Sequence, residues 1–254
     1  MILVRTPFRL SFFGGGSDYP QWHSKHGGLC LASAIDKYSY VSLRRLPPYF
    51  EHNSRVVWSK VELVKSNLDI KHPGIRGVIE YLNLPNERLE IHYDSDIPAR
   101  AGMGSSSAFI VGLLNAYWTL TGEGRCPPHA LAKTAIRVER EHVGDCVGIQ
   151  DQVSCAYGGV NLIRIEKDGE FYVQPVPPLR LKELEDHLLL LFTGFTRHAS
   201  DVARQQVAEM DRHEEAMTDM MAMADEGFKL LSDLDAPIED FLDMLKEAWH
   251  FKKQ

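Results

Sequence analysis

Glycines, serines and two separate carboxylates are the residues of this chain best suited to chemistry. The segment PARAGMGSSSA, residues 98–108, stands between an expected strand and an expected helix. Gly102 and Gly104 can take positive φ angles and bring the backbone close to a ligand. Amides in the first turn of a helix attract phosphate, and three serines can cap this helix or donate hydroxyls: Ser105, Ser106 and Ser107. The loop fits a phosphate site and an ordinary capped helix equally well.

A second group of candidate residues lies in VEREHVGDCVGIQDQ, residues 138–152. Glu139 is expected late in a helix, and Asp151 is expected in a loop behind Gly148. One carboxylate could hold Mg²⁺ while the other orients or deprotonates an attacking hydroxyl. Taken alone, the pair is also compatible with two exposed surface carboxylates.

The third candidate is the loop in LSFFGGGSDYPQW, residues 10–22, with Arg9 just before it. Asp18 follows three glycines, and a carboxylate there can accept hydrogen bonds from vicinal sugar hydroxyls. Its alternative role is an Asx-turn within the loop. Neither a Walker A loop nor a GxGxxG fingerprint occurs in the chain.

These loops need strands and helices to position them. We expect strands at 2–12, 29–46, 87–95 and 187–193, strand-like sequence over 155–178, and helices at 73–82, 107–120, 128–142, 200–226 and from 237 onward. Strands and helices mix without strict alternation, which favours the α+β class. The proline-rich VQPVPPL predicts a boundary between a domain of residues 1–178 and a second of residues 179–254. Methionines in the long helix are expected to fill core space.

Composition narrows the class of protein. The 254 residues are 44% hydrophobic and 25% charged, which is typical of a globular protein. The net charge of −7 argues against general nucleic-acid binding. No apolar run reaches the length of a membrane span, and Arg5 and Arg9 interrupt any signal peptide, so we expect a cytoplasmic protein without a membrane partner. Its four cysteines show no metal-ligand spacing and are expected to be reduced.

The order PFRLSFFGGGSD, PARAGMGSSSA and GIQDQ resembles the GHMP kinase superfamily of small-molecule kinases, which includes galactokinase, homoserine kinase and mevalonate kinase. The resemblance extends over essentially the whole chain, and the glycine-serine loop is its most specific element. It implies a two-domain fold, with an N-terminal ATP-binding domain like ribosomal protein S5 domain 2 and a C-terminal ferredoxin-like domain.

Within the superfamily, GGGSDYP, EREHVGDCVGIQDQ and FTGFTRHAS look most like the D-glycero-D-manno-heptose 7-phosphate kinases. That resemblance implies phosphorylation of the anomeric C1 hydroxyl, giving the 1,7-bisphosphate. ATP and Mg²⁺ are the implied cofactors, and the implied partners are ATP and a sugar phosphate. The other readings are a kinase of fucose, galactose or an N-acetylhexosamine, and a ligand sensor without catalytic activity.

The resemblance also assigns roles to individual residues. Residues 102–107 would wrap the ATP phosphates, with Ser106 or a neighbouring serine and Glu139 reaching Mg²⁺. Asp151 would act on the C1 hydroxyl as base or orienting group, and Arg9 would stand near the transferred phosphate. The substrate side would be formed by four residues: Gly15, Gly16, Asp18 and Arg197.

The sequence departs from the family pattern near its end. Relatives carry a third glycine-rich motif of the form GAGGGG, which is not present in this chain, and the sequence stops at EAWHFKKQ. We therefore expect a truncated second domain. The sequence leaves monomer and homodimer equally open.

Overall fold

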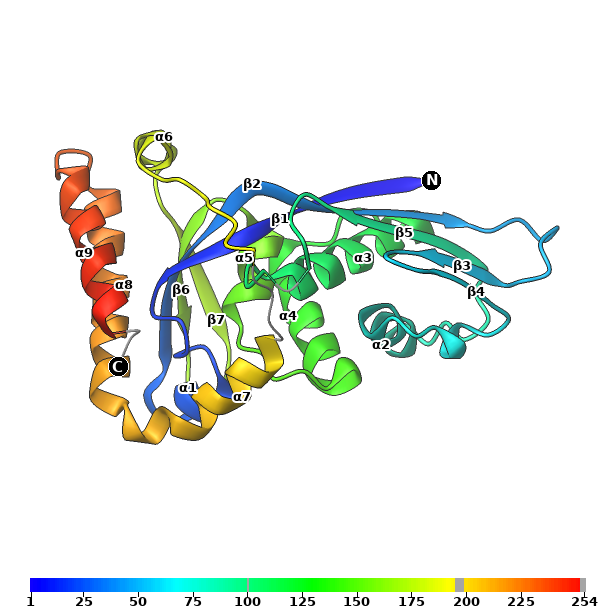
Figure 1. Ribbon diagram of the computed structural model, residues 1–254, viewed down its shortest axis with the longest axis horizontal. Coiled ribbons are helices and arrows are strands. Elements are labelled where there is room, and N and C mark those ends of the chain that lie inside the picture. The colour runs from blue at the N-terminus through cyan, green and yellow to red at the C-terminus, as the bar shows by residue number, and fades with distance from the viewer. Residues whose placement is uncertain (100, 195–198, 252–254) are drawn as a thin grey trace. The chain divides into compact units, whose positions relative to one another are not determined.

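A computed structural model describes residues 1–99, 101–194 and 199–251 (Figure 1). It has the mixed strands and helices of the predicted α+β class. In chain order the elements are β1 (Ile2–Phe13), α1 (Pro20–His26), β2 (Gly28–Arg45), β3 (Ser54–Val57), β4 (Val61–Val64), η1 (Asn67–Asp69), α2 (Pro73–Tyr81), β5 (Leu89–Ser95), α3 (Ser105–Thr121), α4 (Pro128–Arg137), η2 (Val138–Val143), α5 (Gln150–Tyr157), β6 (Val160–Ile165), β7 (Phe171–Pro175), α6 (Pro178–Asp186), α7 (Ala199–Glu209), η3 (Met210–Arg212), α8 (Glu214–Ser232) and α9 (Ile238–Phe251).

The chain packs into two compact units that do not divide at residue 178. Unit 1 comprises Met1–Phe8, Ile35–Val147 and Asp151–Tyr157, and unit 2 comprises Arg9–Ala34, Gly148–Gln150 and Gly158–Gln254. The long strands β1 and β2 each begin in one unit and end in the other. A boundary inferred from a proline-rich segment cannot detect such crossings, because it looks for a single break in the chain.

Unit 1 is built on the strand order β4-β3-β5-β2. Strand β5 pairs antiparallel with β2, from Ser39↔Ser95 to Arg45↔Leu89, and parallel with β3. Alternate residues of β2 and β5, such as Val41, Leu43 and Ile91, point into the core. Helices α2, α3 and α4 supply the other wall of this core, through Ile75, Ile110 and Leu131 among others. The strongly apolar α3 is buried along most of its length, as its sequence predicts.

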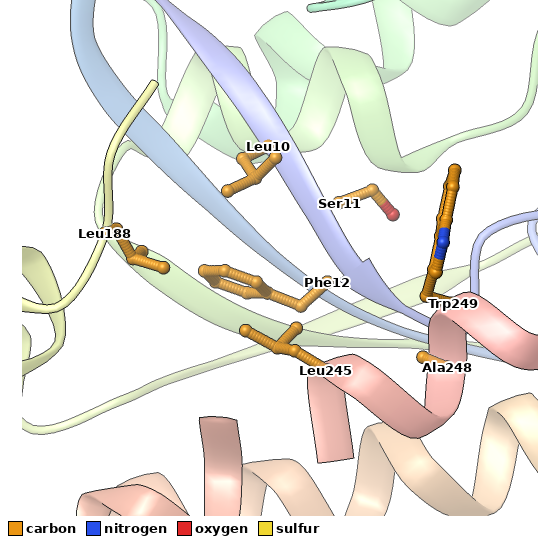
Figure 2. A pocket seen from close by; sticks show the side chains of 7 residues that line it. All are labelled: Leu10, Ser11, Phe12, Leu188, Leu245, Ala248 and Trp249. Atoms are coloured by element: carbon orange, nitrogen blue, oxygen red, sulfur yellow. The ribbon is translucent and has the colours of Figure 1, made fainter. Parts of the chain in front are cut away.

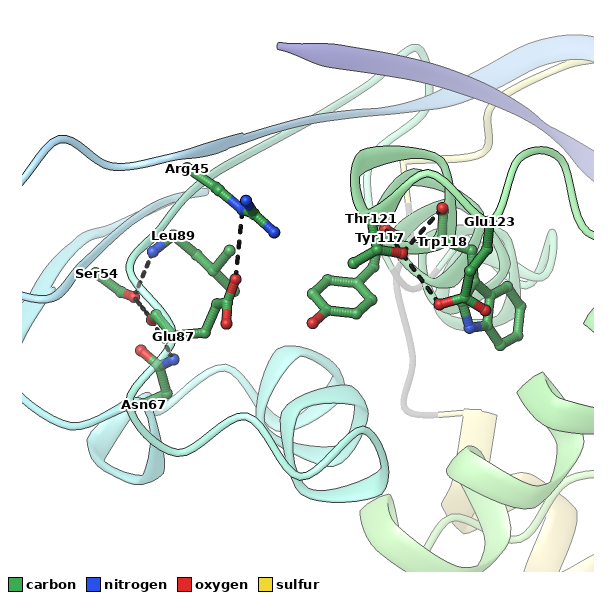
Figure 3. Close-up of polar contacts among 9 residues, drawn as sticks. All are labelled: Arg45, Ser54, Asn67, Glu87, Leu89, Tyr117, Trp118, Thr121 and Glu123. Atoms are coloured by element: carbon green, nitrogen blue, oxygen red, sulfur yellow. Dashed lines mark hydrogen bonds and ion pairs between the residues drawn. The ribbon is translucent and has the colours of Figure 1, made fainter.

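Polar contacts hold the entry to β5 and the end of α3 in unit 1 (Figure 3). The backbone oxygen of Glu87 accepts hydrogen bonds from Asn67 Nδ2 at 2.7 Å and from Ser54 Oγ at 3.2 Å, and Ser54 Oγ in turn accepts from the Leu89 amide at 3.1 Å. These bonds hold the entry to β5. At the end of α3, Thr121 Oγ1 donates to backbone oxygens of the preceding turn, at 3.2 Å for Tyr117 and 3.0 Å for Trp118.

In unit 2, β6 pairs antiparallel with the first part of β2, from Gly28↔Ile165 to Ser33↔Val160, and also with β7. Helices α8 and α9 lie side by side (Figure 1). Their apolar residues join those of the strands in one cluster, in which Phe241 contacts Phe12 and Phe13 edge to face at ring-centroid distances of 5.4 and 5.5 Å. This core positions the glycine loop, which follows β1 directly.

Two sequence expectations for the region after residue 178 differ from the structure. The strand expected at 187–193 is irregular backbone, with Leu189 82% and Leu191 73% exposed. A strand needs a hydrogen-bonding neighbour, and none of the described residues pairs with this segment. The long helix expected over 200–226 is instead α7 and α8, separated by the short turn η3. As predicted, methionines fill core space, because Met210 and Met217 pack against the buried Trp22.

Candidate functional site

The predicted phosphate loop leads directly into α3. Gly102 and Gly104 have φ angles of 77° and 73°, so both use the left-handed region that favours glycine. Gly104 is the N-cap residue, and its carbonyl accepts the first intrahelical hydrogen bond, from the Ala108 amide at 2.9 Å. The N-cap position is taken by this glycine, which makes no side-chain cap bond, and not by one of the serines that could have capped the helix. The amides of the first turn have no carbonyl acceptor within the helix, and this is the arrangement that suits a bound phosphate.

Two of the serine hydroxyls hydrogen-bond to Glu139. Ser107 is buried and its hydroxyl donates to Glu139 Oε2 at 2.8 Å, and the exposed Ser106 also hydrogen-bonds to the Glu139 carboxyl. The Gln152 side-chain amide also donates to Glu139 Oε2. The loop serines and the carboxylate of η2 are thus brought together within unit 1. Gln152 is a partner that sequence reasoning missed, although it belongs to the quoted motif GIQDQ.

Glu139 is fully buried, which changes its acidity. Burial raises the pKa of the Glu139 carboxyl to about 7, and the nearby Asp151 carboxylate also raises it. Hydrogen bonds from Gln152, Ser106 and Ser107 act in the opposite direction, because they favour the ionised form. A carboxylate held in this way is costly to ionise without a positive partner.

These residues fit a bound Mg²⁺. Glu139 Oε1 is buried and makes no hydrogen bond of acceptable geometry with the described residues, so a buried acceptor is left without a donor. Mg²⁺ takes oxygen ligands, commonly one or two from protein together with phosphates and water. No group of three or more His, Cys, Asp or Glu side chains forms a metal site within the described ranges. One carboxylate with a neighbouring serine hydroxyl matches the sparse type of magnesium site.

Asp151 is placed differently from the sequence expectation. It lies in the first turn of α5, not in a loop, and its side chain is half-buried. The helix starts here because the amides of Ile149 and Gln150 are satisfied by a carboxylate from a distant part of the chain, Asp18. Such a cap cannot be recognised from local sequence, since local capping signals lie within a few residues.

The glycine loop after β1 forms two successive turns. The Ser17 amide donates to Gly14 O at 3.1 Å and the Tyr19 amide to Gly16 O at 3.3 Å. Gly16, with a φ of 105°, needs its conformational freedom, and a Cβ there would also lie 2.6 Å from Gln206 Nε2 of α7. At Gly15 a Cβ would meet Gln150 Nε2 at 3.3 Å. The predicted substrate glycines thus lie against polar side chains of unit 2.

Asp18 is buried behind this loop and is only 2% exposed. It accepts four hydrogen bonds from the protein, whereas the sequence predicts that it binds sugar hydroxyls. That role stays a prediction. Of the three remaining predicted residues, Ser105 is the first residue of α3, Arg9 lies half-buried in β1, and Arg197 falls outside the described residues.

The structure also contains a pocket that none of these side chains lines. A pocket of about 230 Å³ in unit 2 is mostly apolar (Figure 2), and it is lined by Leu10, Ser11, Phe12, Leu188, Leu245, Ala248 and Trp249. No predicted site residue lines it. Its walls offer a single hydroxyl and no charged group, so they do not suit a phosphate.

Comparison with known proteins agrees with the motifs. Residues 73–159 match the family described as GHMP kinases N terminal domain. The chain is 28% identical over 268 residues to the D-glycero-alpha-D-manno-heptose 7-phosphate kinase of Campylobacter jejuni, covering 99% of this chain and 77% of that protein. It is 27% identical over 202 residues to a galactokinase of Thermotoga petrophila, covering 73% of this chain and about half, 52%, of the galactokinase.

The fold has relatives among solved structures. The crystal structure of a D-glycero-D-manno-heptose 1-phosphate kinase from Bacteriodes thetaiotaomicron superposes with a TM-score of 0.80 at 23% identity. The superposition covers 100% of this chain and 79% of that one. These matches confirm the resemblance inferred from the motifs. In the described part of the chain, no helix has the length and apolar character needed to cross a membrane.

Proposed function

We propose, from the match of residues 73–159 to the GHMP kinase N-terminal domain, that this chain is an ATP-dependent sugar kinase that phosphorylates the anomeric C1 hydroxyl of D-glycero-D-manno-heptose 7-phosphate. The observation that carries the proposal is the buried Glu139 carboxylate beside the serines of a glycine-rich loop at a helix start. Neither an ordinary capped helix nor a surface carboxylate accounts for this arrangement.

Phosphoryl transfer needs mainly positioning and charge neutralisation. In our proposal, the C1 oxygen attacks the γ-phosphorus, the bond to the ADP oxygen breaks, and the hydroxyl proton passes to Asp151. The loop amides, with Gly102, Gly104 and Ser105, bind the phosphates. Arg9 contributes positive charge near the transferred group.

Mg²⁺ would be held by Glu139 and a loop serine, Ser106 or Ser107. When bound, it would neutralise charge on the ATP phosphates. The buried Ser107 and Gln152 keep the Glu139 carboxylate in one orientation through their hydrogen bonds to Oε2. Its other oxygen, Oε1, is then left available as a ligand.

The heptose phosphate is favoured because the Campylobacter jejuni relative is 28% identical over 99% of this chain, whereas a fucokinase relative with the same coverage is 22% identical and the galactokinase covers 73%. Galactose and fucose are the competing substrates. We assign the sugar side to Gly15, Gly16 and Arg197, with the arginine as the partner for the phosphate at position 7. A site built for that phosphate should discriminate against sugars that lack it, because the arginine would then have no phosphate to pair with.

The test is ADP release from Mg-ATP in the presence of the heptose 7-phosphate, galactose or fucose. We expect kcat/KM for the heptose phosphate to exceed that for each hexose by about 10²-fold or more. Arg197→Ala should remove most of this preference by raising KM for the phosphorylated sugar. The exposed Arg212 provides the matched control, and Arg212→Ala should leave the preference intact.

Two other outcomes would contradict the proposed substrate or the proposed activity. Equal rates with hexoses would retain the kinase and reject the substrate. Absence of ADP release with every sugar, together with tight nucleotide binding, would favour the ligand sensor.

A further inference from the structure

Protein donors fully occupy the Asp18 carboxylate. Oδ1 accepts from the Gly16 amide at 3.1 Å and from Gln150 Nε2 at 3.2 Å. Oδ2 accepts from the amides of Ile149 at 2.8 Å and Gln150 at 3.1 Å. A carboxylate has about four lone-pair directions, so these four bonds use its accepting capacity. The residue is therefore poorly suited to bind a ligand hydroxyl.

We propose that Asp18 is a positioning residue: it fixes the segment Gly148–Gln150 and thereby sets the backbone position of Asp151, the next residue in the chain. The proposal rests on the proposed function, in which Asp151 accepts the proton of the sugar hydroxyl. It differs from a sugar-binding role because Asp18 acts through another residue and touches no substrate.

Gly148 provides independent support. A Cβ at this position would lie 3.0 Å from Asp18 Oδ1 and closer still to Cγ and Oδ2. Its φ is not among the positive values, so the backbone there could accommodate any residue. Glycine is thus required by the close approach of the carboxylate and not by conformation.

The same carboxylate caps α5. The amides of Ile149 and Gln150 lie at the helix start, where donors have no intrahelical partner. A buried negative charge there both accepts their hydrogen bonds and interacts favourably with the helix dipole. Because Asp151 lies in the first turn, loss of the cap should displace it. A displacement of about 1 Å can cost about 10²-fold in rate.

Kinetics can distinguish the two roles of Asp18. We expect Asp18→Ala to lower kcat by about 10²-fold while KM for the sugar changes by less than about 3-fold. Asp18→Asn keeps one oxygen for the two backbone amides, so it should recover activity to within about 10-fold of wild type. A sugar ligand would instead raise KM for the sugar strongly in the alanine variant.

A double-mutant cycle tests the contact itself. Gly148→Ala should lower kcat in the wild-type background, since its methyl group displaces the carboxylate. In the Asp18→Ala background the same substitution should change kcat by less than about 2-fold, because the space is free. Gly74→Ala is the matched control, since its Cβ would meet Phe109 at 3.3 Å and not Asp18. The fold-change in kcat of the double variant should therefore equal the product of the fold-changes caused by Gly74→Ala and by Asp18→Ala alone.

The cycle is measured as ADP release with Mg-ATP and the best sugar, with far-ultraviolet circular dichroism and thermal melts of each variant. Independent, multiplicative effects of Asp18→Ala and Gly148→Ala in an active enzyme would overturn the positioning role and leave the kinase intact. So would a sugar KM raised by more than about 10-fold with kcat unchanged. A folded but inactive wild-type protein would instead remove the proposed function, and this role with it.

Discussion

Replacing Asp151 by asparagine is expected to lower kcat for sugar phosphorylation by about 10³-fold, which lies within the usual range for loss of a general base. The amide has nearly the shape of the carboxylate but cannot accept the hydroxyl proton. KM for ATP should change by less than about 3-fold, because the phosphate loop is untouched. The measurement is steady-state ADP release with the heptose 7-phosphate, with single-turnover kinetics to isolate the chemical step.

Asp145 lies in the same segment of the chain and supplies the control. Asp145→Asn removes the same charge and should keep kcat within about 2-fold of wild type. Equal losses in the two variants would mean that the charge of the segment matters and not a base at position 151. Full activity of Asp151→Asn would assign Asp151 to another role.

Replacing Glu139 by glutamine is expected to have opposite effects on stability and activity. The pKa of Glu139 is raised from an ordinary 4.5 to about 7 by burial, so the folded state holds a proton that the unfolded state has lost. Between these values the unfolded state binds fewer protons, and the free energy of unfolding must fall as pH rises. From pH 5 to pH 8 the loss amounts to roughly 2–3 kcal/mol, since one pKa unit corresponds to about 1.4 kcal/mol.

Glutamine at position 139 abolishes this pH-dependent loss. Urea unfolding of the metal-free protein with a chelator should show a smaller fall in stability between pH 5 and pH 8 for the Gln variant than for wild type. The same variant should lose about 10²-fold in kcat or more, because the proposed Mg²⁺ ligand is gone. In the control, Glu141→Gln alters an exposed carboxylate paired with Arg137 at 2.9 Å and should reproduce neither effect. An unchanged pH dependence in Glu139→Gln would show that another group titrates.

The sequence predicts those elements best whose apolar pattern is strong and local. Helix α3 follows from its apolar run, and β5 from the alternation of Leu89, Ile91 and Tyr93. Strands β3 and β4 escaped prediction because each has only four residues, too few for a period of two to stand out. The irregular segment at 187–193 shows the reverse error, since an apolar run alone does not provide a pairing strand.

The site divides in the same way. Gly102, Gly104 and Glu139 are recognised by residue type and spacing, and the structure gives the two glycines the positive φ angles that were expected. The other features of the site depend on contacts that the sequence does not reveal. Asp18 and Ile149 are separated by more than a hundred residues, so the cap of α5 depends on tertiary structure. The raised pKa of Glu139 also depends on burial, which the pattern of a single helix does not reveal.

The interleaving of the two units has a consequence for synthesis of the protein. Unit 2 takes residues 9–34 from near the start of the chain and combines them with residues from 158 onward. During synthesis on the ribosome, residues 9–34 are made more than a hundred residues before the later part of the unit with which they pack. At about 5–20 residues per second this interval lasts on the order of ten seconds, far longer than a hairpin needs to form. During that time the apolar side chains of Phe12, Phe13 and Leu31 lack their partners from α8 and α9, so they form the kind of transiently exposed apolar surface that promotes aggregation.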